Sequence, residues 1–160
     1  EEVELFVNGV SRGKKAAGKN AGFRTLFEVV YEPGTVEAVA YENGQEIGRM
    51  ELQSAESEVH LELEIEEGRA KELSYIHVWL KDSQGRVMTD CDKKLTAEVT
   101  GDADLAGFGS GNPKPEHSYN EGITETFHGH ALLILRKSEG TESCQVKIKS
   151  EDGLSVEASF

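Results

Sequence analysis

The sequence is poor in cysteine and proline, with two and three among 160 residues. Cys91 and Cys144 are too few for a disulfide framework, and their spacing fits neither a zinc ribbon nor a CxxC redox motif. A single bridge between them stays open at this point. No apolar run approaches the ~18 residues of a transmembrane helix, and no signal-peptide pattern is visible. The sequence therefore predicts neither a disulfide-rich scaffold nor a helical membrane protein.

Basic residues are also scarce. The chain has 17 Lys and Arg against 30 Asp and Glu, for a net charge of -13. Such a chain repels phosphate groups, so the sequence predicts no nucleic-acid partner and no binding to an anionic membrane surface.

Motifs of enzymes and cofactor sites are missing. Residues 107–111, GFGSG, have the spacing GxGxG, but Asn112, Pro113 and then a strand pattern follow, where a phosphate loop needs a helix. We therefore predict no nucleotide cofactor. The glycines are better explained by strand bending and close backbone approach, within a crossover between sheets that Pro113 and Pro115 stiffen. Asn112 is expected to cap the turn there, and Phe127 is expected to lie in the core.

The sequence also offers candidates for a metal site and for a pair of catalytic carboxylates. His128 and His130 have the i, i+2 spacing that places two imidazoles on one face of a strand, so they are metal-ligand candidates. The alternative, which we favour, is surface or inter-strand hydrogen bonding, because Gly129 suggests a bend. One strand face carries three acidic residues, Glu62, Glu64 and Glu66, which we interpret as a solvated edge. No sequence feature identifies a glycosidase acid/base pair among them. The sequence predicts no catalytic residue, no metal and no cofactor.

What the sequence does have is period-2 alternation of apolar residues, which is typical of half-buried strands. It recurs in VHLELEIEE (59–67), YIHVWLKD (75–82), CQVKIK (144–149) and SVEASF (155–160), and the run HALLILR (130–136) is apolar on both parities. Cys144 shares the core parity of its strand. Turn signals DSQG and DG separate these runs. The fold class predicted is all-β, with two immunoglobulin-like β-sandwich modules in tandem.

The first third of the chain has a different set of turn-forming residues. Asn8-Gly9 and Asn43-Gly44 are strong hairpin signals, because both turn residues require positive φ. Between them, residues 23–41 are predicted to form two strands joined at Glu32-Pro33-Gly34. The polar stretch QSAESE (53–58) places the module boundary near Ala55, giving modules 1–55 and 56–160.

These residues resemble a known enzyme family. EVELFVNGVSRGKK and FEVVYEPGTVEAVAYENGQEIGR resemble the small domain of unknown function that follows the catalytic barrel of bacterial family 2 glycoside hydrolases, chiefly β-galactosidases. LSYIHVWLKDSQGRVM, GFGSGNPKPEHSY and ETFHGHALLILR resemble the immunoglobulin-like C-terminal domain of the same enzymes. The resemblance implies an accessory role beside the parent's other domains, and no catalytic residue here, because a barrel needs ~250 residues.

Two other functions are kept open. The outer-face aromatics Tyr75, His77 and Trp79 could form a carbohydrate-binding platform, although packing against another domain is the reading we favour. An adhesion repeat is disfavoured because the two modules differ.

The resemblance also implies that the first module is incomplete at its N-terminus, since the family has strand sequence before Glu2. The strand Val3–Val7 or its neighbour is then expected to present an unpaired edge and to promote self-association.

Overall fold

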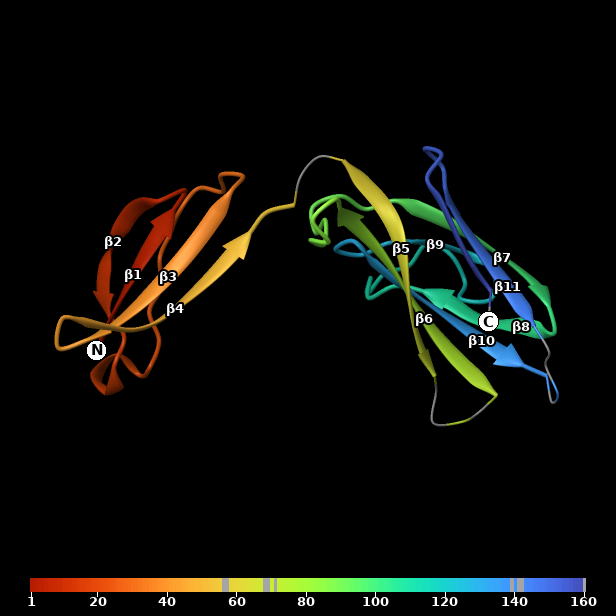
Figure 1. Cartoon of the computed structure of the whole chain (residues 1–160), viewed down its shortest axis with the longest axis horizontal. Helices are drawn as coiled ribbons and strands as arrows, with labels where there is room; N and C mark the ends of the chain where they lie inside the picture. The colour runs from red at the N-terminus through yellow and green to blue at the C-terminus, as the bar shows by residue number, and fades with distance from the viewer. Residues whose placement is uncertain (56–57, 68–69, 71, 139, 141–142, 160) are drawn as a thin grey trace. The chain divides into compact units, whose positions relative to one another are not determined.

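The computed structural model describes residues 1–55, 58–67, 70, 72–138, 140 and 143–159. The chain separates into two compact units, Glu1–Ala55 (unit 1) and Glu56–Phe160 (unit 2). Each unit is built from antiparallel strands, and no α-helix occurs among the described residues (Figure 1). The all-β class predicted from the alternating pattern is confirmed. No helix in the described part of the chain is long and apolar enough to cross a membrane.

Unit 1 is one sheet in the order β2-β1-β3-β4. Its strands are β1 (Glu2–Val7), β2 (Val10–Ala16), β3 (Thr35–Glu42) and β4 (Gln45–Gln53), with a short 3-10 turn at Lys19–Ala21. Both Asn-Gly pairs close hairpins, with φ of 51° and 76° at Asn8 and Gly9 and 50° and 80° at Asn43 and Gly44. These are the paired left-handed residues of a type I′ turn, so both predicted hairpins are confirmed.

The strand predicted before Pro33 is wrong. Residues 24–32 form no strand, and Val30 is 83% exposed. The predicted hairpin needed a free edge on β3, but β1 pairs with one side of β3 and β4 with the other. The segment consequently has no backbone partner in the sheet.

Of the two strands at which an open edge was predicted, Val3–Val7 or its neighbour, the neighbour β2 is an edge strand and Val3–Val7 is not. This strand, β1, lies inside the sheet and pairs with β2 and β3. The edges of the sheet are β2 and β4, two hairpin partners whose side chains are almost all exposed.

One face of the unit 1 sheet carries exposed apolar side chains on its two edge strands, while Val7, on a central strand, is 2% exposed. Val10, Val7, Val36 and Leu52 are direct cross-strand partners and form an apolar row across all four strands. Val10 is 57% and Leu52 65% exposed, and Met50, in the adjacent row, is 69% exposed. An apolar sheet face is stable only when another layer covers it.

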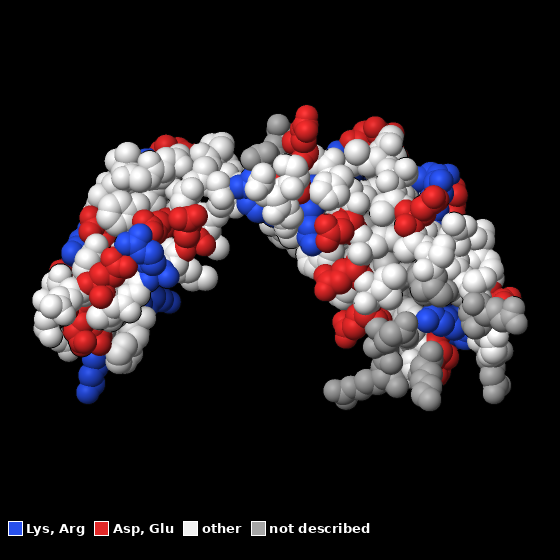
Figure 2. Space-filling view, viewed as in Figure 1, with Lys and Arg blue, Asp and Glu red and all other residues white. Residues whose placement is uncertain are grey.

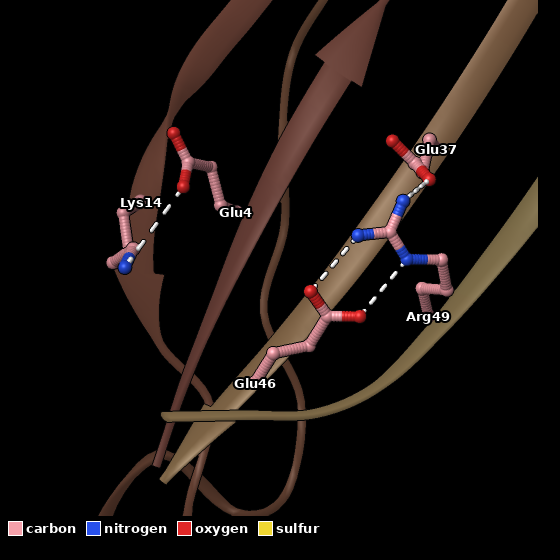
Figure 3. A network of polar contacts seen from close by, with 5 residues as sticks. All are labelled: Glu4, Lys14, Glu37, Glu46 and Arg49. Carbon is pink, nitrogen blue, oxygen red and sulfur yellow. Dashed lines mark hydrogen bonds and ion pairs between the residues drawn. The ribbon is translucent and has the colours of Figure 1, made fainter. Parts of the chain in front are cut away.

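The opposite face of unit 1 is charged. Arg49 contacts Glu37 at 2.6 Å and Glu46 at 2.9 Å, and Lys14 lies 3.9 Å from Glu4 (Figure 3). Beneath these side chains Val39 is buried. Exposed ion pairs contribute little to stability, but they mark this face as the one that water covers.

Unit 2 is a two-layered sandwich. One sheet has the order β5-β6-β10-β8 and the other β12-β11-β7-β9. The strands are β5 (Val59–Glu67), β6 (Leu73–Asp82), β7 (Lys94–Gly101), β8 (Ala103–Gly109), β9 (Ile123–Glu125), β10 (His130–Lys137), β11 (Cys144–Ser150) and β12 (Ser155–Ser159). The run at 130–136 is a central strand, as its apolar character on both parities predicts.

The core of unit 2 follows the alternation in the sequence. Its buried apolar side chains are Leu61, Ile76, Val78, Leu80, Met88, Leu95, Phe108, Ala131, Leu133, Leu135, Cys144, Val146 and Ile148. Both cysteines are free, so the bridge left open above does not form. One carboxylate, Asp82, is fully buried at the end of β6, where it accepts hydrogen bonds from the backbone N–H groups of Gln84 and Arg86 and from the Arg86 side chain.

The glycine- and proline-rich stretch crosses between the two sheets, as predicted. It leaves β8 in one sheet and enters β9 in the other. Asn112 accepts a hydrogen bond from the backbone of Lys114 at 2.9 Å, which is the predicted turn cap. The predicted core position of Phe127 is wrong: its ring is half-buried and packs against His128, because the chain turns there before β10 begins.

Candidate functional site

The predicted outer-face aromatics lie together on β6. Tyr75, His77 and Trp79 are half-buried and alternate with the buried residues of the same strand. They therefore point away from the core, on the outer face of the sheet β5-β6-β10-β8. The alternation alone was sufficient to predict this placement.

A fourth ring joins them from β10. His130 pairs directly with Trp79 in the sheet, and the two ring centroids are 4.0 Å apart. His77 stacks on His130 at 5.2 Å and on Trp79 at 6.0 Å. We call His77, Trp79 and His130 the ring cluster. Its third member was missed because sequence patterns do not give the register between strands so far apart in the chain.

Carboxylates of β5 contact two of these rings. The Trp79 indole N–H donates to Glu64 at 3.1 Å, and Glu66 lies 3.6 Å from His77 Nε2. A third carboxylate on the same face of β5, Glu62, bonds Lys81 at 2.7 Å. The acidic residues predicted as a solvated edge do lie on an edge strand, and each contacts a side chain of β6.

The two imidazoles share one hydrogen bond. His77 Nδ1 lies 3.0 Å from His130 Nε2, so one nitrogen must donate and the other accept. Partial burial lowers the pKa of His130, and the neighbouring His77 lowers it further. His130 is therefore neutral near pH 7 and suited to hydrogen bonding rather than to carrying charge.

His128 and His130, the metal-ligand candidates, do not share one strand face. His128 lies before β10 in the left-handed region, with φ of 52°, and its Nδ1 is 3.1 Å from the carbonyl oxygen of Thr89. His130 instead contacts the ring cluster. Over the described residues, no group of three or more His, Cys, Asp or Glu side chains is arranged to hold a metal ion.

Beside the ring cluster the outer face is hollowed. A recess of about 590 Å³ is lined by His130, Leu132 and Ile134 on one side and by residues 106–111 and Tyr119 on the other. It exists because β8 has glycine at two outward positions. No atom lies within 4 Å of where a Gly107 side chain would begin, whereas Tyr119 fills the corresponding space over Gly109, where its Cε1 lies 2.5 Å from an added Cβ.

Comparison with known proteins places this sandwich in a family. Residues 58–158 match the family model described as "Glycoside hydrolase family 2 C-terminal domain 5". The chain belongs to that family. Residues 1–48 match a domain of unknown function, DUF4982. The resemblance found from the sequence motifs is thereby confirmed for both modules.

Relatives extend the match across both units. The β-galactosidase BoGH2A of Bacteroides ovatus is 28% identical over 168 residues, covering 95% of this chain and 20% of that protein. A protein of Formosa agariphila named as a β-glucuronidase is 29% identical over 142 residues, covering 85% of this chain and 14% of its own length. The chain thus spans a fifth or less of the curated relatives it matches.

A solved structure shares the whole fold. The crystal structure of a glycosyl hydrolase family 2 member from Bacteroides cellulosilyticus superimposes with a TM-score of 0.88 at 29% identity. It covers 100% of this chain, which in turn corresponds to 23% of that protein. The chain is accordingly equivalent to an accessory C-terminal region of a glycoside hydrolase.

Proposed function

We propose that this chain is a non-catalytic, structural C-terminal region of a β-galactosidase of glycoside hydrolase family 2. The supporting observation is that a β-galactosidase aligns over 95% of the chain while only 20% of that enzyme is involved. Most residues of such an enzyme then lie outside this region, and they are enough to form a catalytic barrel of ~250 residues.

The carboxylates of this chain support the non-catalytic part of the proposal. A glycosidase acid must keep its proton near neutral pH, which requires a raised pKa. Four surface carboxyls have a lowered pKa, in each case first because of a hydrogen bond from a Lys or Arg side chain: Glu46, Glu62, Glu98 and Asp152. Acidic side chains are also spread over the visible surface of each unit among basic ones (Figure 2).

The apolar face of unit 1 supports the structural part. Val10, Met50 and Leu52 are each more than half exposed on one face of a single sheet. Patches of this kind mark contacts with other protein surfaces. We infer that another domain of the parent enzyme covers this face, which would couple unit 1 to the rest of the molecule.

The full-length parent enzyme provides the test. We expect it to hydrolyse a nitrophenyl β-galactoside with a higher kcat/KM than the matching β-glucuronide. Glu62→Gln and Glu98→Gln should leave kcat unchanged, with substitution of a barrel glutamate as the control that abolishes it. A preference for the glucuronide would refute the β-galactosidase assignment. Loss of kcat on either substitution in this region, in a folded enzyme, would refute the non-catalytic role.

A further inference from the structure

The recess on the outer face of unit 2 is formed by strand residues and by a crossover that is hydrogen-bonded to β8. Its floor is formed by Leu132 and Ile134 of β10, and one wall is the ring of Tyr119. The backbone of Phe108 donates a hydrogen bond to the carbonyl oxygen of Tyr119 at 2.7 Å, which ties the crossover to β8. The Tyr119 ring is thus held against Gly109 and yet is 53% exposed.

The ring cluster borders this recess. His130 lines the recess and also stacks on Trp79, whose indole is fixed by Glu64. Aromatic faces and apolar side chains therefore lie next to hydrogen-bonding groups: the His130 imidazole, the Tyr119 and Ser110 hydroxyls, and the Glu64 carboxylate. His130 and Glu64 are held by strands of the sheet, and the backbone of Tyr119 is tied to β8, so a ligand would have to order little of the site on binding.

This combination matches the chemistry of a sugar ring. A pyranose has an apolar C–H face, which packs on aromatic and aliphatic surfaces, and a rim of hydroxyl groups, which need donors and acceptors. A recess of about 590 Å³ lies within the usual size range of small-molecule sites, roughly 300–1,000 Å³.

The charge of the surface restricts which sugars fit. Glu62, Glu64 and Glu66 line the outer face of β5 beside the ring cluster, and the chain has a net charge of -13. Negative charge of this density disfavours uronate and sulfated sugars through like-charge repulsion.

We propose that the recess between Tyr119 and β10, together with the ring cluster, binds a pyranose unit of a neutral glycan chain. Binding at this site does not depend on which glycoside the parent enzyme hydrolyses. Its role is to hold a polysaccharide against the C-terminal region.

Binding is measured on the 160-residue chain by calorimetry and by Trp79 fluorescence. The probes are β-1,4-linked tetrasaccharides of galactose, glucose and mannose, each paired with its C6-oxidised uronate form. We expect saturable binding of at least one neutral tetrasaccharide, and at least about tenfold weaker binding of its oxidised form. Lack of binding of all three neutral probes up to about 10 mM overturns the proposal. Equal binding of the oxidised form overturns the assignment to neutral sugars.

Two substitutions locate the site. Gly107→Leu fills the recess, and the backbone tolerates it because no atom lies within 4 Å of the new Cβ. Tyr119→Ala removes the wall, and Tyr31→Ala, at a 68% exposed tyrosine in unit 1, is the matched control. Each recess substitution should weaken binding about tenfold or more, with the control unchanged. Unweakened binding by Gly107→Leu with a wild-type melting curve, or equal weakening by Tyr31→Ala, overturns the placement.

Discussion

Gly129 is the position where one added methyl group should damage unit 2 most. Its φ is 74°, and an added Cβ would collide with the carbonyl oxygen of Met88 while lying 3.0 Å from the Met88 carbonyl carbon. Neither backbone segment can withdraw freely, because Leu80 of β6 donates its N–H to the carbonyl oxygen of Gly129 and accepts the N–H of Met88, at 2.8 and 2.9 Å.

The cost of Gly129→Ala has two parts. Left-handed backbone costs a non-glycine residue about 1–2 kcal/mol, and forcing extra volume into a packed site adds about 1–3 kcal/mol. Gly85→Ala is the matched control, since Gly85 has φ of 77° but no atom within 4 Å of its added Cβ. Gly85→Ala should therefore lose only about 1–2 kcal/mol, which is the cost of the left-handed backbone.

Urea unfolding followed by Trp79 fluorescence measures the difference. The chain has one tryptophan, so this signal reports unit 2 alone. Gly129→Ala should unfold with a free energy lower than that of Gly85→Ala by about 1–3 kcal/mol, at an unchanged denaturant slope. Equal free energies in the two variants would refute the close approach of residue 129 to Met88.

Four further outcomes are expected. Asp82→Ala should destabilise unit 2 by about 2–4 kcal/mol, because it leaves buried N–H groups without their acceptor, and Asp82→Asn should lose less; equal losses in urea melts would contradict the bonds described. Since the pKa of His130 is lowered in the fold, the unfolded chain takes up that proton first as pH falls below ~6.5. Unit 2 should therefore lose stability on acidification below this pH, and His130→Asn should show a flatter dependence. EDTA should leave the melting temperature unchanged, and a large drop would revive a metal site at His128 and His130. The isolated chain should not release nitrophenol from a β-galactoside; activity that disappears with a Glu→Gln change in this chain would contradict its non-catalytic role.

Local rules predicted much of this fold. Alternation assigned the inner and outer faces of β6 and β11, and Asn-Gly located both hairpins of unit 1, because side-chain period and turn conformation are set by neighbouring residues. Pairing between strands that are far apart in the sequence was harder to predict. Residues 24–32 have strand-like composition, but both sides of β3, their predicted partner, are paired with β1 and β4. Phe127 lies at a turn rather than on a strand.

The candidate site shows the same division. The parity of Tyr75, His77 and Trp79 was readable from one strand. That His130 lies opposite Trp79 depends on the register of β10 against β6, which the local sequence does not specify. The recess depends on side chains that glycine lacks. Close approach of another backbone was predicted for residues 107–111, but at Gly109 it is the Tyr119 ring that approaches, and the space over Gly107 stays open.

The pairing order of the strands also sets how quickly each unit can fold. In unit 1 two of the three strand pairs are hairpins between chain neighbours, β1 with β2 and β3 with β4. In unit 2 the central pairs are β6 with β10 and β7 with β11, and each closes a loop that contains several other strands. Because folding rates fall as contacts become more distant in sequence, unit 1 should reach its native hydrogen bonds first, while unit 2 is still searching for its register.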